Sequence, residues 1–147
     1  MMFSEKALHF LTEAGWDSSL CRDTASYTDL LEKEGYTINN HVVEFLQRFG
    51  GLDCALPAFR VPNEFDRLRF DPIYACNGIY RERVEVYEQR TGESLVVVGV
   101  AYSDHLTLMI SATGRVFGAY DDYLAKLGNN YVEAINSMYD CKQPSEV

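Results

Sequence analysis

The sequence predicts an α+β fold, in which an antiparallel sheet packs with N-terminal, middle and C-terminal helices. Three observations support this prediction. About the first 50 residues contain three segments with helical spacing of apolar residues, the segment 95–120 has the apolar pattern of strands, and turn residues separate those strands. Helices that are segregated from a contiguous antiparallel meander favour α+β over a parallel wound sheet.

Three helices are expected in the N-terminal third of the chain. Each follows polar residues that favour a helix start, and each stops at a glycine, which can adopt the left-handed conformation that ends a helix. The start and stop residues are Ser4 and Gly15, Asp23-Thr24 and Gly35, and Asn39 or Asn40 and Gly50-Gly51. The second helix is expected to be short.

The middle of the chain is expected to form a strand pair and then a fourth helix. Pro57 and Pro62 interrupt an extended stretch, and the alternation of residues 67–70 is that of a half-buried strand, so a hairpin or an irregular strand pair fits. The segment from Ala75 to Arg90 regains helical spacing and is predicted to be one helix that ends at Thr91-Gly92.

A C-terminal three-strand antiparallel meander is predicted next. The segment 95–100 is continuously apolar and β-branched, which indicates a strand covered on both faces. Apolar residues alternate over 106–111, and the segment 116–120 follows the turn at Thr113-Gly114. These three strands therefore form consecutive hairpins in the prediction.

The end of the chain is expected to be helical. Residues 123–127 and 131–139 are predicted as closing helices on either side of Gly128, and the tail after Asp140 is expected to be frayed. The sequence has no linker rich in Pro, Gly or Ser, no low-complexity tract and no internal period. One domain over residues 1–147 is therefore expected.

Composition excludes several classes of function. The chain of 147 residues has 22 acidic and 13 basic residues and a net charge of −9, so direct binding of nucleic acid or of an anionic membrane is not expected. The longest apolar run, from Leu95 to Tyr102, is much shorter than the roughly 20 residues of a membrane-spanning helix. Glu5 and Lys6 occupy the place of the apolar segment of a secretory signal, which predicts a cytoplasmic protein.

The cysteines and histidines do not form a recognisable site in the sequence. The four cysteines lack metal-site spacing and are expected to be free thiols, with two disulfides in a secreted protein as the alternative. The three histidines, His9, His41 and His105, fall in different predicted elements, so no metal site and no cofactor are expected.

Two pairs of polar residues suggest catalysis only weakly. Asp104 and His105 in a turn can orient a base for Ser103 or Ser111, as in a hydrolase, but no nucleophile motif is present and a polar turn explains them better. Glu82 and Glu85 can share a helix face as an acid/base pair, although a solvated and charge-compensated face is the simpler interpretation. No catalytic residue is therefore assigned.

The segment Tyr120-Asp121-Asp122-Tyr123 is the first candidate for a partner-binding surface. It combines two acidic side chains with two aromatic rings, and aromatic residues often anchor protein interfaces. The alternative is an ordinary helix N-terminus that Asp121 or Asp122 caps.

Several short strings in this sequence together resemble the SUKH superfamily of bacterial immunity proteins, and most closely its third subgroup. In chain order the strings are Ala14-Gly15-Trp16 with Arg22, Gly35-Tyr36, Phe45-Leu46, Phe49-Gly50-Gly51-Leu52, Phe70-Asp71-Pro72 with Ala75, Leu95, Val98-Gly99, Leu106 with Leu108 and Ile110, Gly114-Arg115-Val116-Phe117, Leu127-Gly128 and Ala134-Ile135. Their order and spacing make the resemblance specific over nearly the whole chain. Two departures are Phe117, where the family tends to have Tyr, and a long gap between Trp16 and Arg22.

The resemblance implies an α+β fold and an immunity protein that binds and neutralises a cognate toxin domain of a polymorphic toxin system, frequently a basic nuclease. The acidity of the chain fits such a partner, and Asp53, Asp66, Asp71, Asp121 and Asp122 are candidate contacts. The alternatives are an intracellular scaffold or regulatory module of the same superfamily and, more remotely, a hydrolase that uses Asp104 and His105. The resemblance sets no oligomeric state.

Overall fold

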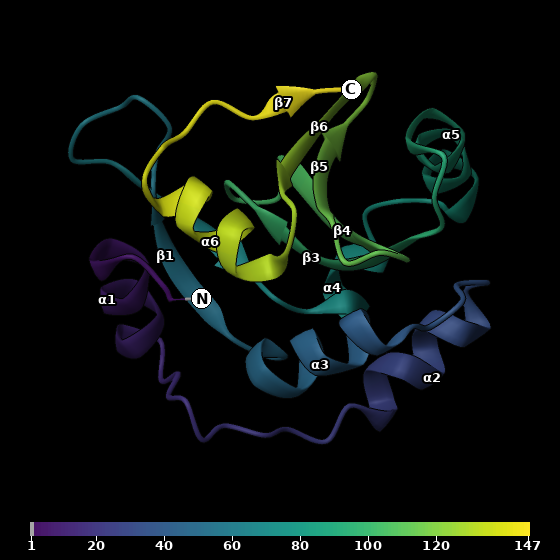
Figure 1. Cartoon of the computed structure of the whole chain (residues 1–147), viewed down its shortest axis with the longest axis horizontal. Coiled ribbons are helices and arrows are strands. Elements are labelled where there is room, and N and C mark those ends of the chain that lie inside the picture. Colours follow the sequence, from purple (N-terminus) through teal and green to yellow (C-terminus); the bar gives the residue numbers. More distant parts are fainter. Residues whose placement is uncertain (1) are drawn as a thin grey trace.

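The computed structural model describes residues 2–147, in which helices and strands follow one another in the order αααββααββββαβ (Figure 1). The helices are α1 (Glu5–Glu13), α2 (Ala25–Lys33), α3 (Asn40–Phe49), α4 (Pro72–Cys76), α5 (Arg81–Thr91) and α6 (Tyr131–Tyr139). The strands are β1 (Asp53–Pro57), β2 (Phe65–Arg69), β3 (Leu95–Ala101), β4 (Leu106–Ser111), β5 (Val116–Tyr120), β6 (Tyr123–Gly128) and β7 (Ser145–Glu146).

Within residues 2–147 the strands form one seven-stranded antiparallel sheet whose spatial order is the sequence order. The predicted α+β class is confirmed, and the predicted meander of β3, β4 and β5 is the middle of this larger sheet. Strands β2 and β3 meet where Arg69 lies opposite Val100. At this junction Gly99 is required, because a Cβ atom at residue 99 would lie 2.3 Å from the main-chain oxygen of Arg69.

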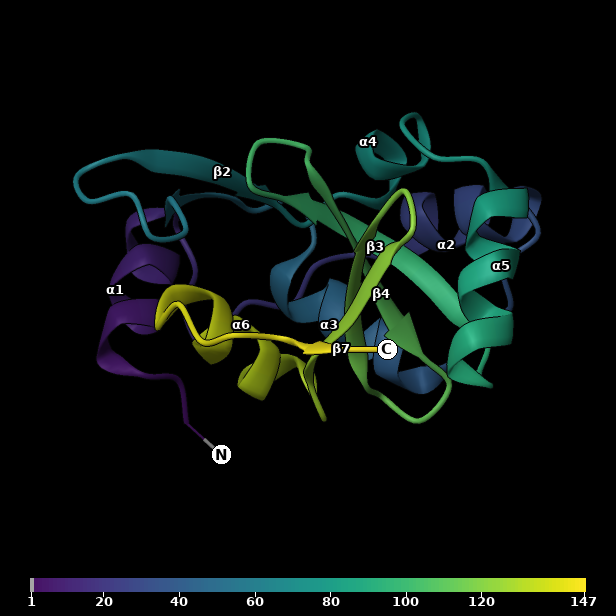
Figure 2. The ribbon, with the colours of Figure 1, turned by 90° about the horizontal axis from the view of Figure 1, so that it is seen from above.

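Helices cover both faces of the sheet. Helices α3 and α6 lie on one side of strands β3 to β6, and α5 lies on the other side (Figures 1 and 2). On the first face Val98 and Leu108 line the same small cavity as Phe45 of α3 and Ile135 of α6. Tyr87 is the largest fully buried side chain of α5. All residues of β3 are buried, as expected for a strand covered on both faces.

The helix caps that the sequence predicts are present at the start of α1 and α3. The Ser4 hydroxyl accepts a hydrogen bond from the Ala7 amide at 3.2 Å, and the Asn39 side chain accepts one from the Val42 amide at 3.1 Å. Gly15 follows the end of α1 with a φ of +99°, a conformation that a side chain would strain. These local signals therefore position the first three helices correctly.

The prediction of a single helix from Ala75 to Arg90 is wrong. Helix α4 begins earlier, because Pro72 occupies its first turn and the Asp71 carboxylate accepts hydrogen bonds from two amides of that turn. The chain leaves the helix near Gly78, and α5 then begins after Tyr80. The helical spacing of residues 75–90 places Tyr80 on the buried face of a helix, but its side chain is 82% exposed.

The prediction of a helix over residues 123–127 is also wrong. This segment is β6, whose main chain pairs with β5 and whose Leu124 and Ala125 side chains are buried. Leu, Ala and Lys favour helices, but this weak preference is overridden by pairing with a neighbouring strand. The tail after Asp140 is not simply frayed, since it includes β7, which pairs with β6 at Ala125 and Lys126. Helix α6 has the predicted bounds.

Candidate partner-binding surface

The segment Tyr120–Tyr123 forms the tip of the β5–β6 hairpin. Tyr120 and Tyr123 are directly opposite each other in the ladder, and their rings stack with centroids 4.9 Å apart. Asp121 and Asp122 make the two-residue turn, in which Asp121 has a φ of +47°. The alternative in which an aspartate caps a helix is therefore wrong, and both aspartates are exposed on a hairpin.

Two side chains of helix α5 bind the main chain of this hairpin tip. The Tyr87 hydroxyl donates a hydrogen bond to the Asp121 carbonyl at 2.7 Å, and Arg90 donates one to the Asp122 carbonyl at 2.8 Å. Arg90 also reaches the Val147 carbonyl at 3.0 Å. Over residues 2–147, neither aspartate side chain is part of an ion pair. The turn is therefore held in place while its two carboxylates remain in solvent.

An open groove of about 850 Å³ lies beside the hairpin tip. It is formed by the β3–β4 turn, the β5–β6 hairpin, α6 and the C-terminal segment 142–147. Its apolar lining includes Tyr102, Leu106, Tyr120, Tyr123, Leu127 and Met138. Its polar lining includes Asp104, His105, Asp121, Lys126, Glu133 and Lys142. A mainly apolar groove with a smaller number of polar groups is the usual composition of a binding site.

The C-terminal segment forms one wall of this groove. Figure 1 shows it leaving α6 and returning to the edge of β6. Gln143 accepts a hydrogen bond from Arg60 of the β1–β2 loop at 3.1 Å, and the Val147 amide donates one to the Leu124 carbonyl at 2.8 Å. The wall is thus attached to the rest of the molecule at both ends.

Asp66 lies at the same end of the sheet as the hairpin tip. Its carboxylate accepts a hydrogen bond at 3.0 Å from the hydroxyl of Ser103, which belongs to the β3–β4 turn. The β3–β4 and β5–β6 turns lie at the same end of the sheet because successive strands are antiparallel. Tyr102 of the same turn lines the groove, and burial raises the pKa of its hydroxyl to about 12.

Asp53 and Asp71 have structural roles away from the groove lining. Asp53 forms ion pairs with Arg67 at 2.7 Å and Arg69 at 3.5 Å, and Asp71 caps α4. The predicted contact residues therefore fall into two sets. Asp66 and the hairpin tip share one end of the sheet, whereas the other two carboxylates are already bound by groups of this chain.

The arrangement around Asp104 and His105 does not assemble a hydrolase site. The Asp104 carboxylate accepts a hydrogen bond from the Tyr74 hydroxyl, and His105 Nδ1 lies 2.8 Å from the Tyr102 carbonyl. Ser103 is bound to Asp66, and Ser111 is buried at the other end of β4. Each side chain of the postulated set thus contacts a different partner.

Metal-ligating side chains are scattered in the structure. Among residues 2–147 no group of three His, Cys, Asp or Glu residues lies close enough to hold a metal ion. His9 and His41 are exposed on α1 and α3. All four cysteines are free, and burial raises the pKa of the Cys54 and Cys76 thiols to about 11.

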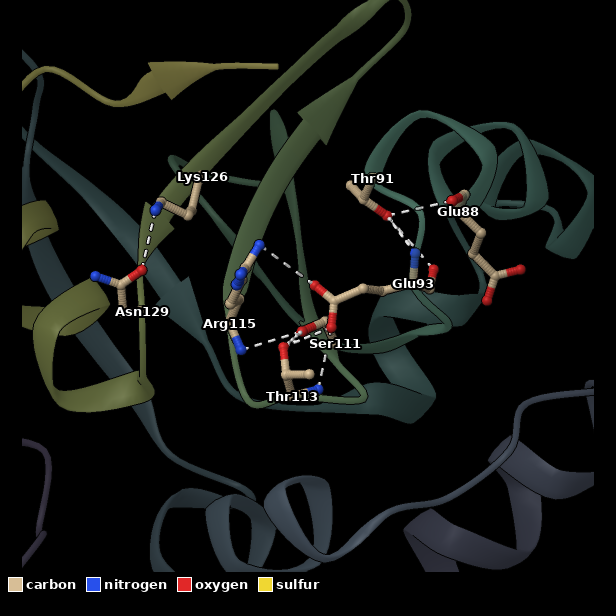
Figure 3. A network of polar contacts seen from close by, with 8 residues as sticks. All are labelled: Glu88, Thr91, Glu93, Ser111, Thr113, Arg115, Lys126 and Asn129. Atoms are coloured by element: carbon tan, nitrogen blue, oxygen red, sulfur yellow. Dashed lines mark hydrogen bonds and ion pairs between the residues drawn. The ribbon is translucent and has the colours of Figure 1, made fainter.

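A second polar network lies at the opposite end of the sheet, around the β4–β5 turn (Figure 3). There the Glu93 carboxylate accepts a hydrogen bond from the Thr113 amide at 3.2 Å and lies 3.8 Å from the Arg115 guanidinium. The Ser111 hydroxyl accepts a hydrogen bond from the Arg115 amide at 3.1 Å. These contacts fix the turn against the segment that follows α5, which is a structural role.

The groove itself is not apparent in the sequence. Its lining comes from five separate segments, the fifth being the β1–β2 loop through Phe59. Two parts of this lining, β6 and the C-terminal segment, are predicted in the wrong conformation. The only signal available is the group of tyrosines and carboxylates around 120–123, which identifies one wall. Leu106, Leu127 and Met138 have the ordinary pattern of core residues.

Comparison with known proteins finds a family-level similarity over most of the chain. A family model described as SUKH-3 immunity protein matches residues 3–140, from before α1 to just beyond α6. We found no match among curated proteins or among solved structures. Among the described residues, no helix combines the length and apolar character that crossing a membrane requires. The family match covers the hairpin and most of the groove and stops short of segment 142–147.

Proposed function

Because the chain belongs to the SUKH-3 immunity protein family, we propose that it binds and neutralises a cognate polymorphic-toxin domain, and that this toxin is a nuclease. In this proposal the protein acts in the cytoplasm as a stoichiometric inhibitor and performs no reaction of its own. The observation that supports it most directly is the hairpin tip, where the main chain is held by Tyr87 and Arg90 and two exposed carboxylates have no ion-pair partner among residues 2–147.

The nuclease assignment follows from electrostatics. A nuclease binds phosphates, so the face that contacts nucleic acid is rich in Lys and Arg. An acidic inhibitor with a net charge of −9 is steered toward such a face, which raises the association rate and blocks the substrate groove. The same charge repels nucleic acid itself.

We place the contact at the end of the sheet that holds Asp66 and the hairpin tip. Tyr120 is 52% exposed beside Asp121 and Asp122, and Tyr123 supports its ring. Aromatic side chains surrounded by polar groups are typical anchors of protein interfaces. Asp53 and Asp71 are weaker candidates, because arginines or main-chain amides of this chain already bind their carboxylates.

Co-expression tests the proposal. A toxin domain encoded beside this gene is expressed alone, with the wild-type protein, and with a variant that carries both Asp121→Lys and Asp122→Lys. Rescue of growth by the wild type, and loss of rescue by the variant with an unchanged circular dichroism spectrum, are expected. A folded wild-type protein that neither binds nor neutralises any adjacent toxin would contradict the proposal, and an isolated gene would favour the scaffold alternative.

A further inference from the structure

We propose that the groove beside the hairpin tip receives an arginine side chain of the toxin, stacked on the Tyr120–Tyr123 ring pair and bound by the adjacent carboxylates. This inference rests on the proposed function and adds the chemistry of the partner. The occupant is a loop that presents one arginine with apolar neighbours.

The size and lining of the groove fit a peptide segment. Its volume of about 850 Å³ falls within the roughly 300–1,000 Å³ of typical binding clefts. Leu106, Leu127 and Met138 line its interior, so part of the occupant is apolar. The charged groups lie in the same lining as these apolar side chains. A long side chain with an apolar stem and a cationic end fits both features.

The tyrosine pair provides a surface for a guanidinium group. The two rings are stacked at an interplanar angle of 22°, and Tyr120 is about half exposed. A guanidinium is planar and weakly hydrated, and it stacks on aromatic faces more readily than an ammonium group does. Hydrogen bonds from Tyr87 and Arg90 to its main chain hold the hairpin tip, so little conformational freedom is lost when a ligand binds.

The same combination of tyrosine and carboxylate holds an arginine at two other places in this protein. The Arg69 guanidinium carbon lies 4.4 Å from the Tyr74 ring centre, and its Nε lies 3.5 Å from the Asp53 carboxylate. Arg81 lies 4.7 Å from the Tyr36 ring centre and 3.0 Å from the Glu88 carboxylate. These two sites show which cation this arrangement of groups accepts.

Arg90, Lys126 and Lys142 lie near the hairpin tip or in the groove lining, but among residues 2–147 none of them forms an ion pair with its carboxylates. Within residues 2–147 no arginine or lysine lies over either ring, and Asp121 has no ion-pair partner. Arg90 is close in sequence to Tyr87, but it donates its hydrogen bonds to two carbonyls. The Lys126 amine is bound to the Asn129 side chain at 2.9 Å. A cation from outside the chain therefore completes the site.

The first experiment measures affinity for the purified toxin domain by calorimetry. Tyr120→Ala is expected to weaken binding by about tenfold to a hundredfold, and Tyr120→Phe by no more than about threefold, because the ring face is retained. Asp121→Asn is expected to weaken binding and its salt dependence. Asp29→Asn, which removes the same charge from exposed α2 away from the C-terminal segment (Figures 1 and 2), is the matched control.

The second experiment needs no toxin. N-acetyl-arginine amide is titrated into the protein while amide and ring signals are followed by NMR, with the neutral isostere N-acetyl-citrulline amide as the control ligand. Saturable shifts at Tyr120, Tyr123 and Asp121 for the arginine compound only, and their loss in Tyr120→Ala, are expected. Equal shifts for both compounds, or shifts spread evenly over the surface, would overturn the inference.

The outcomes separate the inference from the function on which it rests. Full neutralisation by Tyr120→Ala and by Asp121→Asn would leave the immunity function standing and overturn the arginine site. Loss of all toxin binding by the wild type would remove both. A concentration-dependent dimer that Tyr120→Ala disrupts would assign the groove to a second copy of this chain and would also overturn the inference.

Discussion

The hydroxyl of Tyr87 donates a 2.7 Å hydrogen bond to the main-chain carbonyl of Asp121, and this bond links the covered face of the sheet to its exposed hairpin tip. The Tyr87 ring is buried in α5, whereas Asp121 is exposed. A core residue thus sets the position of the surface residues that we assign to partner binding. The bond therefore connects folding stability with the position of the proposed contact.

Replacing Tyr87 with Phe tests this connection. The ring still fills its place in the core, so the loss is that of one hydrogen bond, about 1 kcal/mol in the free energy of unfolding. Faster hydrogen exchange is expected in the β5–β6 turn. The control is Tyr27→Phe, because the Tyr27 hydroxyl donates no hydrogen bond among the described residues. Removing this hydroxyl is expected to lower the free energy of unfolding by less than about 0.5 kcal/mol. Equal exchange in both variants would contradict the role of Tyr87.

The junction of β2 and β3 predicts a large effect for a small substitution. In Gly99→Ala the added methyl group would lie 2.3 Å from the Arg69 carbonyl oxygen, which is main chain and cannot move without breaking the sheet. A loss of about 2–4 kcal/mol in the free energy of unfolding is expected from urea titration. Gly78→Ala is the matched control, because its nearest contact would be at 3.6 Å. An equal loss in both variants would refute this explanation.

The ion pair of Arg81 with Glu88 is expected to contribute to stability because both side chains are largely buried, with 23% and 18% of their surfaces exposed. Glu88 also accepts a hydrogen bond from the Leu95 amide at 2.8 Å, which joins α5 to the start of β3. Arg81→Met leaves the largely buried Glu88 carboxylate without its cation, at a cost of about 2 kcal/mol. The control is Arg83→Met, on the exposed side of α5, which should change thermal stability little. Similar shifts in the melting temperatures of the two variants would contradict the prediction.

Alkaline pH is expected to destabilise the protein through Tyr102. Burial raises the pKa of this hydroxyl from 10.0 to about 12 in the folded state, so the unfolded chain releases its proton first. The contribution of the protonated Tyr102 hydroxyl to folding stability is fully present below pH 10 and is lost as the pH rises toward 12. Urea titrations across this window should show a shallower decline for Tyr102→Phe than for the wild type, and parallel curves would show that Tyr102 does not contribute.

Local signals in the sequence are sufficient to predict the structure where a residue interacts with its own neighbours in the chain. The Ser4 and Asn39 caps and the left-handed Gly15 determine helix ends through bonds within a few residues. Strand β3 is continuously apolar because both of its faces are covered, and this pattern is visible in the sequence. The predicted helices, the central meander and the α+β class depend on such signals.

The errors occur where distant partners decide the conformation. Residues 123–127 contain helix-favouring Leu, Ala and Lys, yet β5 on one side and β7 on the other pair with their main chain. The turn at Asp121-Asp122 lacks the glycine that marks a typical hairpin, so a turn at this position has little local signal. Helix α4 starts earlier than the apolar spacing indicates, because Asp71 caps it and Pro72 occupies its first turn, and it ends at Asn77 before α5 begins.

The candidate site was predicted only in its exposed part for the same reason. Aromatic and acidic side chains in one short segment indicate residues 120–123 as a candidate surface, but they do not indicate that these residues form a hairpin tip. The groove depends on contacts between segments far apart in the chain, such as that of Arg60 with Gln143. No pattern within a single segment encodes such a contact.

The most direct test of the central claim is a titration of the purified toxin domain with this protein, followed by the rate at which the toxin cleaves nucleic acid. The account predicts that the rate falls in proportion to added protein and reaches zero at about one molar equivalent, as expected for tight binding. It also predicts that the protein alone cleaves nothing. Unchanged toxin activity at about tenfold molar excess of the folded protein would contradict the claim that it acts by binding this partner.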